Sequence, residues 1–564
     1  MRTLLTVILA LGFSISTWAQ TALAFNKYWV QFKDKNNSPY SLSNPQSFLS
    51  ERALARRTAY NIALTNQDLP VSPVYVQGIQ NTGAIVLYSS KWLNGVVVQV
   101  SDSVQLQAID GLPFVSEKKA VALSRRKNNQ IKNLMSPNNT RISVVLQNEE
   151  KQRAWGGDVY YGTAFNQINM LNGDHLHAFG YQGEGMLVAV LDAGFDNVDN
   201  NPAFETLRNE GRLLGGRDFT DGDSYVYEGS SHGSNVLSIM AAEIPGTFVG
   251  SAPKAQYYLI RTEYAASETL IEEYNWVAGA ELADSLGVDV INSSLGYTTF
   301  DFEQMNHTYE DLDGDKTVCT RGADIAAAKG ILVVISAGNS GEQPWHHISA
   351  PSDADSILTI GATDSLGIHA GFSGYGPSAD GRVKPNIVGQ GEMTAYVNTS
   401  GNTTAGNGTS YSSPLLAGLV TCLWQADRSK NNMEIIQAVE RSASQYDNPD
   451  DAMGYGLPDF HVAMADLGVY IDKIESNPNR SFLYPNPFNT ELNVYYYATA
   501  NTNVSIQLLD TSGKILQAQQ QYVTEGTPYR FLLDAWQNYP KGIYLVKIID
   551  GDNQQLLQAI KMAD

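Results

Sequence analysis

Ser410 stands at a position in this chain of 564 residues where a hydroxyl could act as a nucleophile. It lies in the stretch NGTSYSSPLLAG, where a glycine-rich segment leads into the apolar run PLLAGLVTCLW. That run predicts a buried helix, and Pro414, which is best tolerated in a first helical turn, predicts a start close to Ser410. Backbone N–H groups that are free at a helix start can stabilise an oxyanion. A lone serine here is more simply explained as a helix N-cap, so other residues must decide.

Two further residues supply what a serine nucleophile requires. Asp192 ends the apolar run LVAVLD, and a carboxylate at the end of a buried strand is unfavourable unless it is paired or belongs to a site. His232 follows a Gly/Ser loop and begins the helix predicted for SNVLSIMAAE. A histidine can take the proton of a serine hydroxyl, and an aspartate can fix the histidine's tautomer. A turn aspartate and a capping histidine are the structural alternatives, but the three residues together predict a triad with Ser410.

The elements that would position these residues alternate along residues 155–468. The strand-like runs are GMLVAVLDAG, QYYLIRT, GVDVINSSLG, GILVVISAGN and SILTIGATD, and the helical runs include SNVLSIMAAE, EEYNWVAGAELADSLG and ADIAAAKG. This alternation predicts an α/β domain whose mostly parallel sheet carries helices on both faces. Sites in such folds lie beyond the carboxyl ends of the strands. Those ends hold Asp192, the run that ends at Gly296, and the run from Ala337 to Asn339.

The segment before this domain divides into three parts. Residues 1–19 combine Arg2 with an apolar core and a small-residue cleavage site, which predicts a secretory signal peptide. Residues 20–124 contain strand-like and helical runs (KYWVQFKDK, SERALARRT, TGAIVLYSSKWLNGVVVQV and SVQLQAIDGLPFV), which predict a small α+β domain. Residues 125–154 are polar and predict an exposed linker in which a protease could cut.

The end of the chain has a different pattern. Residues 478–564 alternate in the manner of strands, in ELNVYYYA, NVSIQLLD, TPYRFLLDA, GIYLVKIID and LLQAIKM, which predicts a small all-β sandwich. Beyond the signal peptide no apolar run reaches the length of a membrane span, so we expect none in the mature protein. The formal charge of −21 argues against nucleic acid as a partner.

Two local features have open interpretations. Asp311, Asp313 and Asp315 alternate in TYEDLDGDKTVCTRG, a segment that we interpret as an insertion, and such oxygens suit calcium. An exposed acidic turn is an equally good explanation. Cys319 and Cys422 are the chain's two cysteines, and two small buried apolar residues are favoured over a disulfide.

Five motifs in chain order resemble those of the subtilisin-like serine peptidases, over roughly residues 155–467. They are VAVLDAG, HGSNVLSIMAA, VINSSLG, SAGNSG and NGTSYSSPLLAG. The chain departs from the family pattern at Asn235, where the family usually has a second histidine, and at Tyr411 and Ser412, which are tolerable variants. The order aspartate, histidine, serine on a parallel α/β sheet is also that of subtilisin.

The resemblance implies a role for each residue of the site. Ser410 would attack the scissile carbonyl, His232 would transfer the proton, and Asp192 would orient the imidazole. The Asn339 side chain and the Ser410 backbone N–H would hold the oxyanion. Catalysis would need no cofactor. The residues implied in substrate binding are Ser294, Leu295, Gly296, Ala337 and Gly338.

The flanking domains also resemble accessories of this family. Residues 20–124 resemble its inhibitory prodomain by pattern and position. The C-terminal domain resembles a type IX secretion sorting domain of Bacteroidota, by the motif YPNPFN, the run Gly542–Tyr544 and the terminal Lys561. We therefore expect a secreted or surface-located endopeptidase that processes its own precursor. Its expected partners are protein or peptide substrates, its own prodomain as inhibitor, and the secretion machinery. The alternatives are an inactive surface adhesin on this scaffold and a dedicated processing protease.

Overall fold

The structure is a computed structural model that describes residues 26–123, 161–469, 481–484, 492–498, 500–525, 528–533, 539–551 and 553–561. The predicted signal peptide (1–19) and the predicted linker (125–154) lie outside the described residues. The chain divides into two compact units, one made of residues 1–39 and 70–130 and the other of residues 40–69 and 131–564.

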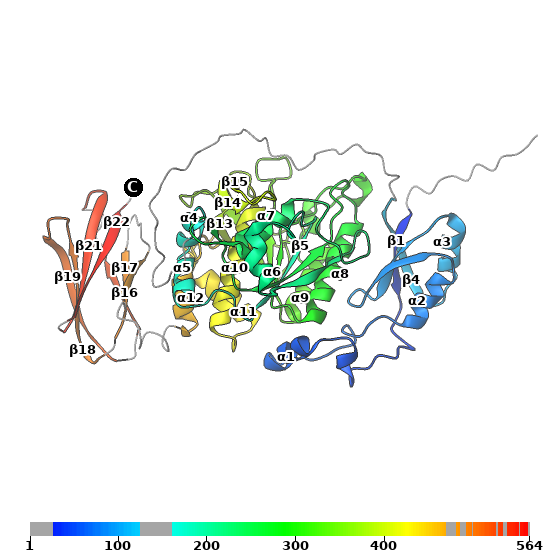
Figure 1. The fold of residues 1–564 in the computed structure, drawn as a ribbon, viewed down its shortest axis with the longest axis horizontal. Helices are drawn as coiled ribbons and strands as arrows, with labels where there is room; N and C mark the ends of the chain where they lie inside the picture. Colours follow the sequence, from blue (N-terminus) through cyan, green and yellow to red (C-terminus); the bar gives the residue numbers. More distant parts are fainter. Residues whose placement is uncertain are drawn as a thin grey trace, which may run out of the picture. The chain divides into compact units, whose positions relative to one another are not determined.

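The first unit has the α+β character predicted for it. Its four strands form an antiparallel sheet in the order β2-β3-β1-β4, of which Figure 1 labels β1 and β4. Its core contains Val30, Val96 and Val98 from the strands and Ile79 and Ile109 from the helices. The elements are β1 Lys27–Phe32, α2 Pro73–Gln80, β2 Ile85–Ser90, β3 Gly95–Gln99, α3 Ser103–Asp110 and β4 Val115–Ala122.

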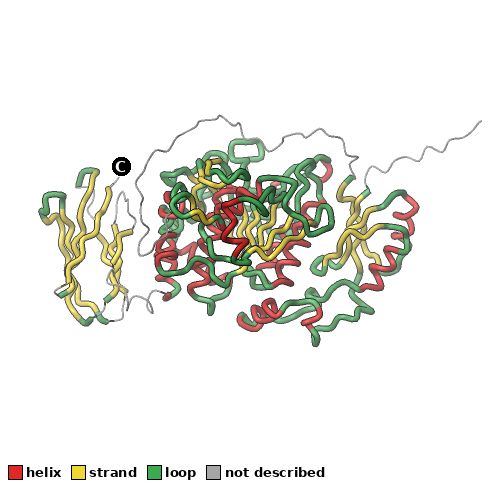
Figure 2. Tube along the Cα trace, viewed as in Figure 1, coloured by secondary structure: helices red, strands yellow, loops and turns green. Residues whose placement is uncertain are grey.

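The peptidase-like part of the second unit is built on a seven-stranded parallel sheet in the order β13-β12-β11-β10-β5-β9-β6, visible as the yellow strands among helices in Figure 2. The predicted mostly parallel α/β sheet is thereby confirmed. Its strands are β5 Leu187–Asp192, β6 Leu213–Asp218, β9 Gln256–Arg261, β10 Val290–Ser293, β11 Leu332–Ser336, β12 Leu358–Thr363 and β13 Ile387–Gln390.

Alternate residues of each strand point to opposite faces of this sheet, and helices cover both faces, so that all residues of β5 are buried. Val188 and Val190 of β5 share a core with α7 and α10, which pack side by side (Figure 1). Leu191 instead faces α8, where a Cβ on Gly279 would come within 3.3 Å of it. The helices are α4 Phe165–Asn169, α5 Gly173–Ala178, α6 Glu205–Asn209, α7 His232–Ala241, α8 Ile271–Leu286, α9 Val318–Ala328, α10 Thr409–Ala426, α11 Asn432–Arg441 and α12 Phe460–Asp466.

Smaller elements complete this part of the chain. The antiparallel pair β14 and β15 lies between β13 and α10 in the sequence, and β15 ends just before α10, whose first turn carries Ser410. The remaining elements are β7 Glu243–Ile244, β8 Phe248–Val249, β14 Thr394–Val397, β15 Thr403–Gly406, and the 3₁₀ turns η2 Pro202–Phe204, η3 Glu303–Met305 and η4 Tyr309–Asp311.

The C-terminal domain is the predicted all-β sandwich. One sheet has the order β16-β17-β20 and the other β19-β18-β21-β22. Side chains of both sheets form one core, among them Val494, Phe531, Ile506 and Val546. The strands are β16 Ser481–Tyr484, β17 Leu492–Tyr497, β18 Thr502–Leu509, β19 Ile515–Val523, β20 Pro528–Leu533, β21 Gly542–Asp550 and β22 Asn553–Lys561.

Residues 40–69 correct the prediction that residues 20–124 form one compact domain. They contain the 3₁₀ turn η1 Pro45–Ser47 and the helix α1 Glu51–Ala59, which is the helix predicted for SERALARRT, and they belong to the second unit. The buried side chains of α1 are Ala53, Arg56 and Arg57. Two buried arginines cannot join the apolar core of the first unit, since a buried charge requires partners of opposite charge.

Candidate active site

Asp192 and His232 form a hydrogen-bonded pair at the carboxyl end of the sheet. Asp192 is the last residue of β5 and is fully buried, and His232 is the first residue of α7. Nδ1 of His232 lies 2.8 Å from Oδ1 of Asp192, which also accepts the N–H of Ala193 at 2.7 Å. The imidazole is 20% exposed, so its other nitrogen can reach the solvent side of the site.

The environment of His232 favours its protonated form. Burial of the imidazole opposes a positive charge, but the negative charge of Asp192 and its hydrogen bond outweigh burial, so that the pKa of His232 lies above its ordinary value. Such a pair is suited to take up a proton and to hold it while a reaction proceeds.

Ser410 lies in the first turn of α10, which begins at Thr409, close to the predicted start. Pro414 lies deeper in the helix than predicted. Because proline has no N–H, Pro414 cannot make the usual helical hydrogen bond to the carbonyl of Ser410, four residues earlier. The hydroxyl of Ser294 replaces that donor, with its Oγ 3.1 Å from the Ser410 carbonyl oxygen. The missing N–H of Pro414 therefore leaves the Ser410 carbonyl free to bond to Ser294, the residue that follows β10.

The surroundings distinguish Ser410 from Ser412 and Ser413, the two other serines at the start of α10. Ser412 and Ser413 are fully buried, and their hydroxyls donate to the carbonyl of Thr409 at 3.1 Å and to Oδ1 of Asn292 at 3.0 Å. Ser410 is only partly buried, and its hydroxyl makes a long bond of 3.3 Å to the Ser294 carbonyl. Among the hydrogen bonds of the described residues, none joins Ser410 directly to His232. Of the three serines, Ser410 has the most accessible hydroxyl.

Asn339 is exposed next to the start of α10, and its orientation is fixed by Thr409. The side-chain oxygen of Asn339 accepts the backbone N–H of Thr409 at 2.8 Å and its hydroxyl at 2.9 Å. The amide nitrogen thereby points away from Thr409, and it lies 3.7 Å from where a Cβ on Gly408 would be. Within the described part of the chain, neither this nitrogen nor the backbone N–H of Ser410 has a hydrogen-bond acceptor. The structure thus leaves two donors available near the serine hydroxyl.

Of the residues predicted to bind substrate, Ser294 bonds to Ser410, and the other four fall into two groups. In the described part of the chain, Leu295 and Gly296 make no main-chain hydrogen bond, so their polar groups remain available to an extended peptide. Ala337 and Gly338 differ, because their N–H groups donate to the Ile360 carbonyl and the Thr409 hydroxyl. Their carbonyls also accept bonds from within the domain. These two residues can therefore line a pocket but have no free donor for a substrate.

The structure does not bring Asp311, Asp313 and Asp315 together as a calcium site. Asp311 caps the turn η4 by accepting from Thr308, and Asp313 accepts the N–H of Asp315 at 3.2 Å. The ammonium group of Lys316 lies 3.0 Å from Asp313 and neutralises part of the charge. The three carboxylates are not among the groups of the described residues whose oxygens converge on one point. The calcium interpretation therefore lacks geometric support.

Among the described residues, the carboxylate oxygens of two other acidic groups do converge. Asp218, Asp221 and Glu228 surround Arg261, whose guanidinium supplies the compensating positive charge. The second group is Glu263, Glu268 and Glu272. Burial raises the pKa of Glu263 to about 7 and that of Glu268 to about 9, so these carboxyls tend to hold protons.

Sequence reasoning missed two supporting residues. Thr409 orients Asn339, and Glu263 lies near Asp192, with its Oε1 accepting from Tyr297 at 2.5 Å. Thr409 could have been suspected from its place before Ser410, whereas nothing local marks Glu263. The two cysteines are free and buried, as the favoured interpretation predicted.

Three family models match the chain. The model described as "Peptidase S8 propeptide domain, Bacteroidota" matches residues 27–136, and "Subtilase family" matches residues 183–456. The third, "Secretion system C-terminal sorting domain", matches residues 482–562. The predicted order of prodomain, peptidase domain and sorting domain is thus confirmed. No helix among the described residues is both long and apolar enough to span a membrane.

Curated proteins similar to this chain include several subtilisins of Bacillus species. Subtilisin DY of Bacillus licheniformis is 28% identical over 291 residues, which are 51% of this chain and 93% of that protein. The thermophilic serine proteinase of Bacillus sp. (strain AK1) is 29% identical, over 57% of this chain and 72% of that protein. Among solved structures, MycP1 from the ESX-1 type VII secretion system is 20% identical over 56% of this chain and 90% of that one, with a TM-score of 0.43.

Proposed function

Because this chain belongs to the subtilase family of serine endopeptidases, we propose that it hydrolyses peptide bonds through Asp192, His232 and Ser410. The observation that carries this proposal is the hydrogen-bonded pair of Asp192 and His232 at the carboxyl end of the sheet, with α7 packed against α10. Ser410 lies in the first turn of α10, and its hydroxyl is more accessible than those of Ser412 and Ser413.

The proposed reaction starts when the Ser410 hydroxyl leaves its long bond to the Ser294 carbonyl and turns to His232. Nε2 of His232 takes the hydroxyl proton while Oγ attacks the scissile carbonyl carbon. The bond from Nδ1 to Asp192 keeps the imidazole in the required tautomer and stabilises the imidazolium. His232 then gives the proton to the leaving amine, and water hydrolyses the resulting acyl-enzyme by the reverse sequence.

Charge on the substrate oxygen would be stabilised by two donors. These are the amide nitrogen of Asn339 and the backbone N–H of Ser410, which have no acceptor within the described part of the chain. Because Thr409 holds the Asn339 oxygen, the donor is fixed before substrate arrives. Preorganised donors of this kind stabilise a transition state without reorganising at the moment of reaction.

The precursor would be exported through its signal peptide and cut by its own active site in residues 125–154. The propeptide domain before that segment would inhibit the enzyme until it is removed. The sorting domain indicates delivery to the type IX secretion machinery. This order fits a protease that must stay inactive until it leaves the cell.

A serine-directed phosphonylating reagent should inactivate the purified mature enzyme in proportion to the label incorporated. The reason is that Ser410 would be the nucleophile for the reagent as well as for substrates. The readouts are residual peptidase activity and the mass of the labelled peptide, and a chelator-treated sample should retain its initial rate. Full activity after complete labelling would contradict the proposal.

Deleting residues 478–564 should block export without stopping peptidase activity. The sandwich has a core of its own and contributes none of the proposed site residues. In the native host, the truncated chain should accumulate in the periplasm and be active in the extract. The full-length Ser410→Ala chain is the control for export. Normal secretion of the truncated chain would refute the sorting role.

A further inference from the structure

Residues 40–69, which we call the anchoring arm, interrupt the propeptide domain in the sequence but fold with the peptidase domain. The propeptide family model spans residues 27–136, and the arm lies inside that span. The chain leaves the first unit after Pro39 and returns to it at Pro70. The contacts of the arm therefore show how part of the propeptide binds the enzyme.

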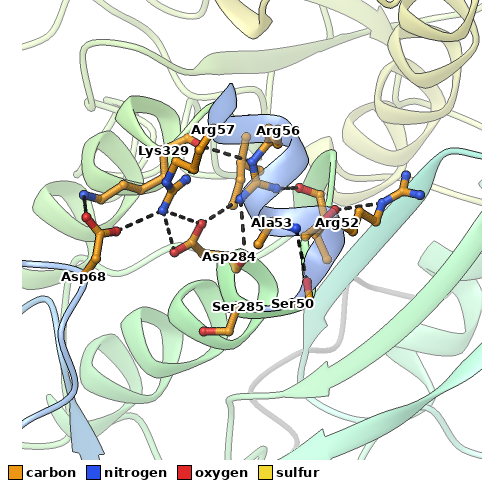
Figure 3. Close-up of polar contacts among 12 residues, drawn as sticks. Ser50, Arg52, Ala53, Arg56, Arg57, Asp68, Asp284, Ser285 and Lys329 are labelled. Carbon is orange, nitrogen blue, oxygen red and sulfur yellow. Dashed lines mark hydrogen bonds and ion pairs between the residues drawn. The ribbon is translucent and has the colours of Figure 1, made fainter. Parts of the chain in front are cut away.

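Arg56 makes the central contact of the arm (Figure 3). Its guanidinium lies 2.6 Å from Oδ1 of Asp284 at the end of α8, and its Nε donates to the Lys329 carbonyl at 3.0 Å. It also donates to the carbonyl of Val288. Arg56 is thus held by one carboxylate and by carbonyls of two separate loops of the peptidase domain.

Arg57 extends this contact into a closed network. It bonds to Asp284 at 2.9 Å and to Asp68, a residue of the arm itself, at 3.0 Å. Lys329 of the peptidase domain completes the network, since its ammonium lies 3.2 Å from Asp68 and its carbonyl accepts from Arg57 at 2.6 Å. Negative and positive charges therefore alternate along Asp284, Arg57, Asp68 and Lys329, and the arm and the peptidase domain each supply one charge of either sign.

Arg52 fastens the other end of α1. It pairs with Asp289, and its guanidinium donates to the carbonyls of Gly287 at 2.9 Å and Gly185 at 2.8 Å. The backbone of α1 also lies close, because a Cβ on Gly287 would come within 2.6 Å of the Ala53 nitrogen. Such proximity requires a glycine at the end of α8.

The arm binds at the amino ends of the parallel strands, whereas the candidate site lies at their carboxyl ends. Gly185, Val288 and Lys329 come just before β5, β10 and β11 respectively, whereas Asp192 and Ser294 mark the other ends of two of these strands. In a parallel sheet the amino and carboxyl ends of the strands are on opposite sides of the domain. The arm therefore does not block the active site, and its contacts attach the propeptide to the peptidase domain.

The contact is buried in a way that resists dissociation. The side chains of Arg56 and Arg57 are each 3% exposed, and that of Asp284 is 0% exposed. If the arm left, Asp284 would lose both arginines, and the carbonyls at the amino ends of the strands would lose their donors. Removing one side of a buried ion pair is strongly unfavourable.

We propose that the anchoring arm, which binds away from the active site, stays bound to the peptidase domain after the linker is cut and ties the N-terminal fragment to it. Release of the propeptide domain would then require further cuts near the ends of the arm, around Pro39 and Pro70. The arm itself would remain as a permanent part of the enzyme. This inference extends the proposed maturation, but its test does not depend on self-processing.

The test uses the full chain with Ser410→Ala and a recognition sequence for an added site-specific protease within residues 125–154. After that cut, gel filtration in native buffer measures whether the N-terminal fragment elutes with the peptidase domain. We expect co-elution at submicromolar protein. Separation of the fragment on the first passage would overturn the proposal. A failure of self-processing in the unmodified chain would leave this result unaffected.

Substitutions in the arm test whether its contacts hold the cut fragment on the peptidase domain. Arg56→Gln with Arg57→Gln should speed dissociation of the cut fragment at least tenfold. Lys118→Gln is the matched control, because its ion pair with Asp110 at 2.7 Å lies wholly within the first unit. The control should dissociate at the parent rate. Equal rates for the double variant and the parent would overturn the proposal.

Arg52→Gln serves if the double variant does not fold. Asp289 would keep its second partner Arg428, 2.8 Å away, so this substitution leaves no carboxylate unpaired. Dissociation should again be faster than in the parent, and an unchanged rate would contradict the proposal. Hydrogen exchange of the cut parent gives an independent readout, with α1 remaining protected if the arm is bound and losing protection if it is not.

Discussion

Replacing Ser410 with alanine should lower kcat by about 10⁶-fold, the size of loss found when a triad serine is removed. The fold should survive, because the hydroxyl makes a single long bond, of 3.3 Å, and the smaller side chain fits the same space. The loss of that bond costs about 1 kcal/mol, against a domain stability of about 5–15 kcal/mol. Steady-state kinetics with a peptide substrate and a thermal melt measure both quantities.

Ser412→Ala is the matched control for this substitution. Ser412 lies in the same helical turn, but its hydroxyl is buried and bonded to Thr409. Its replacement should change kcat by far less than a hundredfold. The proposal would be contradicted if Ser410→Ala kept more than a hundredth of the parent's kcat, or if the two variants lost activity equally.

Replacing Asp192 with asparagine should lower kcat by about 10⁴-fold, because the amide favours the wrong tautomer of the histidine. It should also shift the pH dependence. In the parent, the pKa of His232 is raised, and the base works only when neutral, so kcat/KM should fall as pH drops through an apparent pKa above the ordinary histidine value. Without the charge of Asp192, burial prevails and lowers that pKa.

The measurement is the pH profile of kcat/KM for the parent and for Asp192→Asn. The acidic limb of the variant should move to lower pH while its plateau falls. An acidic limb that stays at the parent's pH would mean that another group controls the profile. Glu263 is the candidate for such a group, because burial raises its pKa to about 7 and the negative charge of Asp192 adds to that shift.

Sequence patterns predicted the main sheet because its central strands are continuous apolar runs. They did not predict β6 or β13, which contain glycine and lie at the two edges of the sheet. The strand β19 was missed for a similar reason, since its glutamines give no apolar alternation at a sheet edge. Edge strands carry the weakest patterns because one side of them meets solvent.

The helix α9 begins earlier than the pattern predicted. It starts at Val318, so part of the segment interpreted as an acidic insertion is helical. The buried Glu273 explains this start, because its carboxylate accepts the N–H groups of Val318 and Cys319 at 2.9 and 3.1 Å. Thr317 also caps this start, since its hydroxyl accepts the N–H of Thr320 at 3.2 Å, and that local signal was missed.

Long-range partners limited what could be predicted about the site. The position of Ser410 at a helix start follows from local pattern, and so does that of His232. The bond of Ser294 to the Ser410 carbonyl does not, because it joins residues more than a hundred positions apart. The same holds for the arginines of α1, whose helix was predicted but whose partners Asp284 and Asp289 were not.

The most direct test of the central claim is the mass and N-terminal sequence, under denaturing conditions, of the parent and of Ser410→Ala, both made in a host without other proteases. We predict that the parent's peptidase chain begins between Arg125 and Trp155, with the propeptide as a separate chain. Ser410→Ala should be one chain that begins near Gln20. If Ser410→Ala matures to the same N-terminus as the parent, Ser410 is not the nucleophile that processes the precursor.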